Sequence, residues 1–345
     1  MPRPARRADT VLSVISRVPR GPALLVCAVL LGLAAGCSGE DLAKANYQRT
    51  TVSAEPGTAS GDVPTGPIDD PAVGLAALRT VDPCAVLSQD TLAGLGTRTG
   101  EPYQSEWGQC RVDVQDAGGK VIGLGLDLGE AFVIDDRASG AVEGLPLIEE
   151  QADDTTCLLT AVTSRDPGLG IGLQVNYEGG GNPCGPGYTA LQRVLQLLHD
   201  NPPQYEQPPG SLLAVDPCGT AGRRALDDVL GAGAAGQPQG LHQCQYSVDG
   251  RGPTVTVRFR SGYPPTPDDG APADLGRGVT AIQEQSTVDG PVCEAGWQHL
   301  ATGEEGASEL VAVEFYGNEG DGTKQQACER AVTVARSVVP NLPRP

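Results

Sequence analysis

The chain's cysteines are the residues whose type and spacing most strongly predict chemistry. After Cys27 and Cys37, eight cysteines follow in two groups of four, and both groups open with the same gap. The eight are Cys84, Cys110, Cys157, Cys184, Cys218, Cys244, Cys293 and Cys328. The chain has no C-x-x-C pair of the kind that structural zinc sites use. An even number of cysteines in an exported chain predicts disulfide bonds rather than a metal site.

Four cysteines can pair in three ways, so the connectivity in each group is a choice between alternatives. We favour Cys84–Cys110 with Cys157–Cys184, and Cys218–Cys244 with Cys293–Cys328. The equal first gap in the two groups suits a local bridge between an opening helix and the first strand. In the chain-entropy model, closing a loop of this length stabilises the fold by about 3–4 kcal/mol.

Histidine is the other residue type here that could bind metal or take part in catalysis. The chain has three, His199, His242 and His299. They could belong to a zinc site or to a Ser-His-acid triad, but no G-x-S-x-G or H-E-x-x-H motif accompanies them. We therefore interpret them as surface or loop-edge residues. The sequence predicts no catalytic residue, no metal site and no cofactor.

Acidic pairs and tryptophans have plain structural interpretations. The acidic pairs include Asp135-Asp136, Glu149-Glu150, Asp153-Asp154, Asp268-Asp269 and Glu304-Glu305. In a chain this acidic, such pairs are typical of solvated loops.

Trp107 and Trp297 lie near the second and seventh cysteines of the frame, which favours packing beside a disulfide. The alternative is an apolar groove that holds a lipid or a peptide.

The N-terminus has the pattern of a targeting segment, and we assign residues 1–36 to it. Its apolar run is about 14 residues long, shorter than the ~20 that a spanning helix needs. The segment ends Leu33-Ala34-Ala35-Gly36-Cys37, which resembles the lipobox of bacterial lipoproteins. That resemblance implies a signal peptide cleaved before Cys37, with Cys37 acylated. The alternative is an ordinary secretory signal peptide, with Cys37 left as an unmodified free thiol.

The net charge limits the partners that the chain can bind. The leader's five arginines and one aspartate give it a net charge of +4, so its removal takes the chain from −19 to −23. So acidic a chain repels nucleic acid and anionic lipid head groups, which excludes nucleic-acid partners. Membrane attachment must therefore come from acyl chains on Cys37. We expect the protein on the outer face of the cell membrane, with its domains in the cell-wall space.

Composition and repetition divide the remaining chain. The segment Val81-Asp82-Pro83-Cys84 recurs as Val215-Asp216-Pro217-Cys218, which predicts two related domains. Residues 37–76 are rich in Gly, Pro and Ser without apolar periodicity, and predict a disordered tether. We therefore expect a first domain over 77–200, a proline-rich linker over 201–213 and a second domain over 214–342.

Each predicted domain has the same order of elements. An aspartate and a proline form a helix N-terminus at Asp82-Pro83 and at Asp216-Pro217. We expect the first helix to continue through Leu92 and the second through Leu230. About five strand-like runs follow in each domain. A closing helix carries one apolar face, from Tyr188 to Leu198 in the first domain and from Ala331 to Val339 in the second. The fold class is therefore α+β: two tandem domains, each a mainly antiparallel sheet flanked by two helices and stapled by disulfides.

The D-P-C start, the lipobox-like leader and the acidic tether resemble a family of actinobacterial cell-envelope lipoproteins of unknown function. Members usually carry one D-P-C domain, and here two copies are present. Val86-Leu87 matches the apolar pair that follows the cysteine, whereas Gly219-Thr220 departs from it. The two-disulfide plan is also similar to extracellular sensor domains of some actinobacterial serine/threonine kinases. The resemblance implies a location and a fold, and no reaction.

The functional prediction from sequence is a lipid-anchored, non-catalytic binding or interaction protein of the cell envelope. Its partner would be an envelope protein or a small ligand. One alternative is a carrier that holds a hydrophobic ligand between the domains. The other is an envelope hydrolase with a site unlike known motifs.

Overall fold

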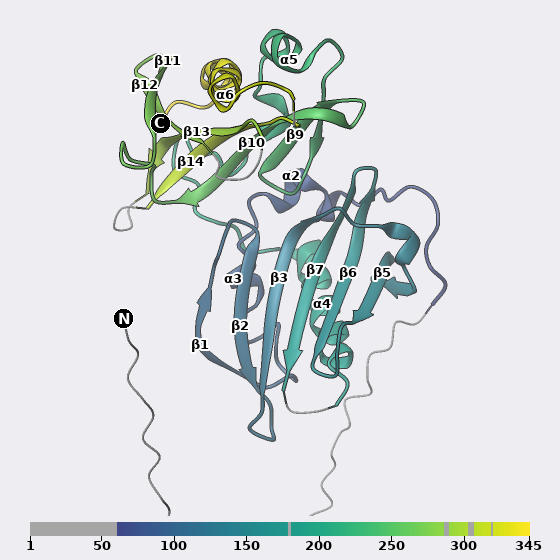
Figure 1. Ribbon diagram of the computed structural model, residues 1–345. Helices are drawn as coiled ribbons and strands as arrows, with labels where there is room; N and C mark the ends of the chain where they lie inside the picture. The colour runs from purple at the N-terminus through teal and green to yellow at the C-terminus, as the bar shows by residue number, and fades with distance from the viewer. Residues whose placement is uncertain (1–60, 179–180, 286–289, 303–306, 319) are drawn as a thin grey trace, which may run out of the picture. The chain divides into compact units, whose positions relative to one another are not determined.

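The computed structural model describes residues 61–178, 181–285, 290–302, 307–318 and 320–345. Two antiparallel sheets with flanking helices make up this part of the chain (Figure 1). The fold is α+β, which confirms the fold class predicted from sequence. Residues 1–36 and Cys37 lie outside the described residues. None of the helices that the structure describes is long and apolar enough to cross a membrane.

The first sheet has seven strands in the order β1-β2-β3-β7-β6-β5-β4. They are β1 (Thr97–Tyr103), β2 (Gln109–Gln115), β3 (Val121–Ala131), β4 (Gly140–Val142), β5 (Leu145–Gln151), β6 (Thr156–Arg165) and β7 (Gly168–Tyr177). The helices of this domain are η1 (Pro71–Val73), α2 (Leu75–Leu78), α3 (Pro83–Val86), η2 (Asp135–Arg137) and α4 (Cys184–Asp200).

The second sheet also has seven strands, in the order β11-β12-β13-β14-β10-β9-β8. They are β8 (Ala235–Pro238), β9 (Gln243–Val248), β10 (Arg251–Gly262), β11 (Ala271–Gly276), β12 (Val279–Gln285), β13 (Val292–Ala301) and β14 (Ser308–Tyr316). The helices are η3 (Pro217–Gly219), α5 (Arg223–Leu230), α6 (Lys324–Val338) and η4 (Val339–Asn341). Taken from β8, this order matches that of the first sheet, so the two domains share one topology.

One long helix packs on each sheet through the apolar face that its periodicity predicts. In α4, Leu191, Val194 and Leu195 are fully buried against β6 and β7. In α6, Ala331 and Ala335 are fully buried against β13 and β14. Burying a row of apolar side chains at helical spacing supplies the main driving force for docking each helix.

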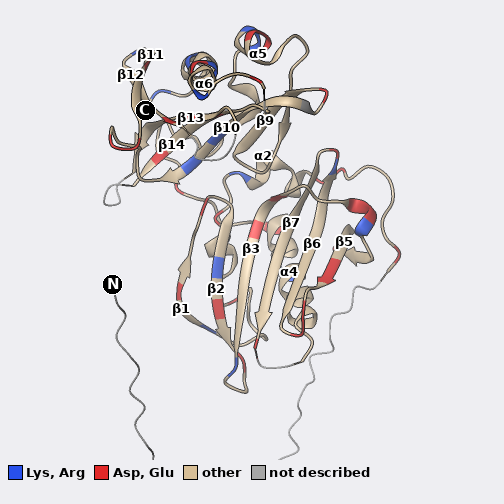
Figure 2. Ribbon diagram, in the orientation of Figure 1, with Lys and Arg blue, Asp and Glu red and all other residues tan. Residues whose placement is uncertain are grey.

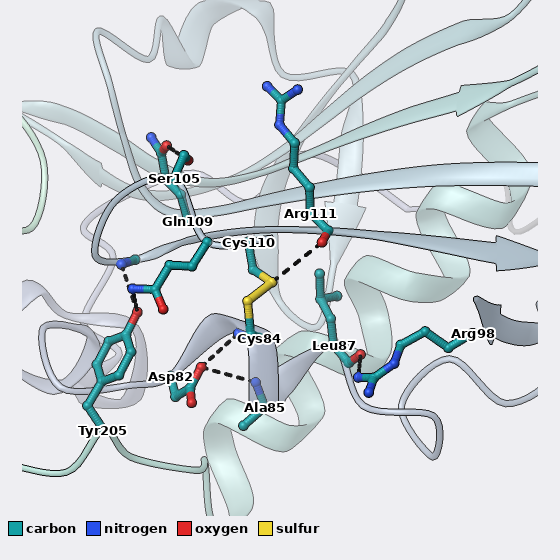
Figure 3. The surroundings of a disulfide bond; sticks show 12 residues. Asp82, Cys84, Ala85, Leu87, Arg98, Ser105, Gln109, Cys110, Arg111 and Tyr205 are labelled. Atoms are coloured by element: carbon teal, nitrogen blue, oxygen red, sulfur yellow. Dashed lines mark hydrogen bonds between the residues drawn. A yellow bond between two sulfur atoms is a disulfide. The ribbon is translucent and has the colours of Figure 1, made fainter. Parts of the chain in front are cut away.

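Four disulfides tie helices to strands. Cys84–Cys110 joins α3 to β2 and Cys157–Cys184 joins β6 to α4, while Cys218–Cys244 and Cys293–Cys328 make the matching links in the second domain. This is the connectivity favoured from the gaps. Figure 3 shows the first bridge, beside which Asp82 Oδ1 accepts the N–H of Cys84 (2.9 Å) and of Ala85 (3.1 Å). Four disulfides indicate an oxidising, extracytoplasmic compartment.

Each sheet has two more strands than the five or so expected. The additional strands are β1, β4, β8 and β11, and the sheet orders place all four at edges. They lack the alternation that reveals a half-buried strand: β1 is largely exposed, β4 has three residues and β8 four. Pairing with a neighbouring strand, rather than burial of their own side chains, makes them strands.

The opening helices are shorter than predicted. The expected helix from Asp82-Pro83 through Leu92 ends at Val86, where turns replace it. In the second domain, η3 ends at Gly219 and α5 begins as a separate helix at Arg223. The aspartate caps form as predicted, but the residues that follow favour turns over a continuous helix.

The segments predicted to be tether and linker are partly packed. Val73 is 1% exposed in the first core, and Arg165 Nε donates to the Gly66 carbonyl at 2.9 Å. Leu212 is fully buried in the second core. Tyr205 accepts a hydrogen bond at its hydroxyl from Gln104 Nε2 (2.8 Å). The apolar residues scattered through these segments have no periodicity of their own, so only their burial in a neighbouring core reveals them.

Candidate functional site: a polar cavity on the first sheet

The first sheet has one face covered by α4 and an opposite face that carries polar side chains (Figure 1). Along β3, the apolar residues from Ile122 to Leu128 are buried at every second position. The intervening positions, which include Gly125 and Asp127, therefore lie on the face opposite α4. Figure 2 shows charged residues on β2 and β3 of this sheet.

A cavity of about 220 Å³ opens on this face. Strand pairing brings its polar lining together, because Asp127 of β3 lies between Gln109 of β2 and Gly172 of β7, and Gly172 pairs with Thr160 of β6. The main polar residues that line it are Ser105, Gln109, Arg111, Asp127, Glu130, Thr160 and Gln174.

Glycines form the floor of the cavity. Gly125 of β3 and Gly172 of β7 both line it, so two central strands present bare backbone here. A Cβ at Gly172 would overlap the Glu130 Oε2 atom. The Glu130 carboxylate can therefore lie over β7 only because position 172 is glycine.

Two carboxylates stand close together in this cavity. Asp127 Oδ2 accepts the side-chain amide of Gln109 and Oδ1 accepts the Gly129 N–H, both at 2.9 Å. Glu130 Oε2 accepts the Thr160 hydroxyl at 2.8 Å. Among the described residues, neither carboxylate forms an ion pair with a lysine, arginine or histidine. The cavity therefore holds negative charge that the structure does not neutralise.

Burial shifts the titration of both acids. Desolvation raises the pKa of Asp127, against the lowering effect of its hydrogen bonds from Gly129 and Gln109. Desolvation also raises the pKa of Glu130, and the nearby charge of Asp127 raises it further. Both effects disfavour the charged forms, so a bound cation would relieve them.

Arg111 flanks the acids on β2. Its side chain is exposed, and it forms no hydrogen bond or ion pair with any described residue. Figure 3 shows it directed away from the Cys84–Cys110 bridge, to the other side of β2. A free guanidinium at the rim of the cavity is available to an anionic group of a ligand.

The corresponding face of the second sheet has a different chemistry. There Gln243 of β9 pairs with Arg258 of β10, in the register where Gln109 pairs with Asp127. Arg260, further along β10, forms an ion pair with Glu294 (3.4 Å). The two domains therefore share a topology but present opposite charges at this position.

The structure places the three histidines in separate surroundings. His199 Nε2 lies 2.7 Å from Asp70 Oδ2, and this hydrogen bond is the main cause that raises its pKa. His299 Nε2 lies 2.9 Å from the Gly210 carbonyl. His242 is buried with its ring against Trp107, at a centroid distance of 5.0 Å. The described residues contain no group of three potential metal ligands.

Of the acidic pairs, Glu304-Glu305 lies outside the described residues, and Asp135-Asp136 lies in η2 rather than in a loop. Asp135 and Glu150 form ion pairs with Arg165 and Arg137. Trp297 is 2% exposed inside the second core, as core packing predicts. Trp107 is half-buried against residues of the second core.

Asp127 and Glu130 were not among the residues that the sequence suggests. Neither belongs to an acidic pair or a known motif. The only indication in the sequence is the alternation of glycine and leucine over 121–128, which predicts a strand with few side chains on one face. An acid on that bare face is a candidate ligand-binding residue.

No family model and no curated protein matches the chain. One solved structure, the crystal structure of DynU16 from the dynemicin biosynthetic locus, is 13% identical to the chain. The match covers 79% of this chain and 95% of DynU16, with a TM-score of 0.16. A likeness of that size supports no inference about fold or function.

Proposed function

We propose that the protein is a non-catalytic binding protein of the bacterial cell envelope, held on the outer face of the membrane by acyl chains on Cys37. The lipobox-like ending of the leader supports the anchor, and the four disulfides agree with an extracytoplasmic location. The resemblance of the D-P-C segments to envelope lipoproteins supports the same placement.

The ligand is a small molecule that carries a positively charged nitrogen. The observation that carries this proposal is the cavity on the first sheet, in which Asp127 and Glu130 have raised pKa values and no basic partner. An ammonium or guanidinium group between them would satisfy both carboxylates. The glycine floor lets such a group approach the backbone of β3 and β7 closely.

The polar lining distinguishes this proposal from a carrier of hydrophobic ligands. A carrier needs a largely apolar cavity, because each buried polar group without a partner opposes the transfer of an apolar chain. The cavity on the first sheet contains Arg111, Asp127 and Glu130. Its chemistry fits a polar ligand.

A second candidate function is hydrolysis in the envelope. It is favoured by the same two carboxylates, because neighbouring acids with raised pKa values can act as general acid and general base. This candidate differs from binding in one measurable respect. A ligand that the wild type converts to product, but that Glu130→Gln binds without conversion, would establish an enzyme.

The test of binding is isothermal titration calorimetry of the purified full chain with spermidine, a flexible polyamine. We expect saturable binding at one site, weakened at least tenfold in Glu130→Gln, because this variant removes the charge and keeps the size of the side chain. Glu149→Gln is the matched control, since Glu149 lies on β5 of the same sheet and is exposed. Its spermidine affinity should stay within twofold of the wild type.

Equal affinities for Glu130→Gln and Glu149→Gln would contradict the proposal. They would show that spermidine associates with the general negative charge of the chain, which is −19 over its full length. Raising the salt concentration separates the two cases, because diffuse association is screened within about 10 Å at 0.1 M salt, whereas a buried contact persists.

A further inference from the structure

Arg111 is a charged residue of the cavity on the first sheet that a simple cation would leave unused. It lies on β2 directly opposite Gly125 of β3, and both residues line the cavity. A Cβ at Gly125 would lie 3.8 Å from Arg111 Cγ and 4.0 Å from Arg111 Nε. The arginine side chain therefore extends over this glycine, and the cavity holds one positive charge beside its two negative ones.

The positive and negative charges of the cavity lie at different places on its floor. Arg111 extends over Gly125, whereas the Glu130 carboxylate lies over Gly172. Gly125 pairs with Gln174, so Gly172 is its diagonal neighbour across β3 and β7. Diagonal neighbours of this kind lie about 7–8 Å apart.

These opposite charges do not neutralise each other. Among the described residues, no ion pair joins Arg111 to Asp127 or to Glu130. All three side chains keep some exposure to solvent, so a ligand can reach them. A ligand with a cationic group and an anionic group at a distance from each other would satisfy both ends of the cavity.

An apolar contact lies between polar groups in the same cavity. Strand pairing places Arg111, Gly125, Gln174 and Leu158 in one row across β2, β3, β7 and β6. Leu158 lines the cavity and is 38% exposed. An exposed leucine among polar groups suits the methylene stem of a lysine-like chain, which packs on apolar surface while its charged end stays polar.

We propose that this cavity binds a free basic amino acid of the lysine type. The ligand's carboxylate accepts hydrogen bonds from the Arg111 guanidinium. Its ε-ammonium, at the other end of a four-carbon stem, donates to Asp127 and Glu130. Two cationic groups and one anionic group thus match two carboxylates and one guanidinium. The inference rests on the proposed function, because it names the ligand class of the same site.

The test compares L-lysine with 1,5-diaminopentane, which has the same chain and both ammonium groups but lacks the carboxylate. Each is titrated calorimetrically into the full chain at about 0.15 M salt, which screens diffuse attraction to the acidic surface. Lysine should bind saturably at one site and at least tenfold more tightly than diaminopentane. L-norleucine, which lacks the ε-ammonium, should also bind at least tenfold more weakly than lysine.

Arg111→Gln separates the two ligands. It should weaken lysine binding at least tenfold, whereas diaminopentane should bind as well as before or more tightly, because a repelling charge is gone. Arg111 is exposed, so the variant should fold. Arg137→Gln is the matched control, since it removes the same charge from η2, outside the lining of the cavity. Its lysine affinity should stay within twofold of the wild type.

Three results would overturn the inference: no saturable lysine binding, lysine binding no tighter than that of diaminopentane, or equal lysine affinities for Arg111→Gln and Arg137→Gln. The first two use only the wild type, so they decide the matter even if a variant fails to fold.

The inference and the proposed function fail separately. Spermidine has no carboxylate, so its binding does not require Arg111. Spermidine binding that depends on Glu130, without any preference for lysine, would remove this inference alone. Loss of the Glu130 dependence would remove the proposed function as well.

Discussion

Glu130 accepts one hydrogen bond, from Thr160, and lies beside the charge of Asp127. A carboxylate in this setting favours the protonated form, because burial removes solvation and a like charge repels it. Asp127 is better satisfied, with two donors, yet burial still raises its pKa. The pair therefore costs the fold some stability when both are charged, which is typical of residues kept for binding or catalysis.

This pair predicts a specific dependence of stability on pH. The pKa of Glu130 is raised in the folded state, so its contribution to stability is complete below the ordinary value of 4.5 and is lost as pH rises through the raised value. Glu130→Gln keeps an oxygen to accept from Thr160 and removes the charge. We expect the variant to melt at the same temperature as the wild type near about pH 4, and at a higher temperature near about pH 7.

Differential scanning calorimetry across this range checks the prediction. Glu149→Gln serves as the control, because an exposed carboxylate should change the melting temperature little at either pH. A Glu130→Gln variant that is less stable than the wild type at neutral pH would show that the charged form is stabilised, and would contradict the assignment.

At the scale of elements, the cavity depends on how β2, β3, β7 and β6 pair. Residues 109, 127, 172 and 160 lie on four strands and become neighbours only through the register of the sheet. A shift of one residue in any strand would turn its outward side chain into the core. The buried leucines of β3 hold that register, so the core of the first domain positions the polar site.

The glycine at position 172 should matter for the site more than for the fold. In Gly172→Ala, the new methyl group would displace the end of the Glu130 side chain, which is flexible, and break its hydrogen bond from Thr160. We expect a loss of stability of about 1 kcal/mol and at least a tenfold loss of spermidine affinity.

Gly123→Ala is the matched control, because Gly123 of β3 lies on the same face of the sheet as Gly125 and Asp127. A Cβ there would have Asp113 Oδ1 and Asn176 as its nearest neighbours, at 3.4 Å or more, so the change should leave spermidine affinity unaltered. Chemical denaturation and calorimetry measure the two effects. Equal losses of affinity in both variants would mean that any added side chain on this face disturbs the sheet.

At the scale of the whole molecule, the same topology occurs twice with different surface chemistry. Asp127 in the first sheet corresponds by register to Arg258 in the second. Arg79, 7% exposed, donates from Nη2 to Asp216 Oδ1 and from Nε to the Leu241 carbonyl, both at 2.9 Å. The cap of the second D-P-C segment is therefore hydrogen-bonded to a residue that precedes the first.

The proposed lipid anchor concerns the whole chain, and replacing Cys37 tests it. Replacing Cys37 with serine should move the protein from the membrane fraction to the soluble extracytoplasmic fraction, because the chain would carry no acyl groups and its strong negative charge repels anionic lipids. Fractionation with radiolabelled palmitate measures both location and acylation. Membrane association that persists in Cys37→Ser without label would contradict the anchor.

The sequence by itself determined the α+β class, the central strands and the two closing helices, and its cysteine gaps favoured the disulfide pairing that the structure contains. These features follow from local periodicity and from short separations along the chain. The edge strands and the packed parts of 61–76 and 201–213 depend on neighbours that are distant in sequence, so periodicity does not reveal them.

Only the tertiary structure decided which polar residues meet. Asp127 and Glu130 are two of the 43 acidic residues of the chain. Nothing local distinguishes them. Asp127 and Glu130 become a site because four paired strands bring them together over glycine. Burial and long-range register create that chemistry, and neither is a property of a residue's neighbours in the chain.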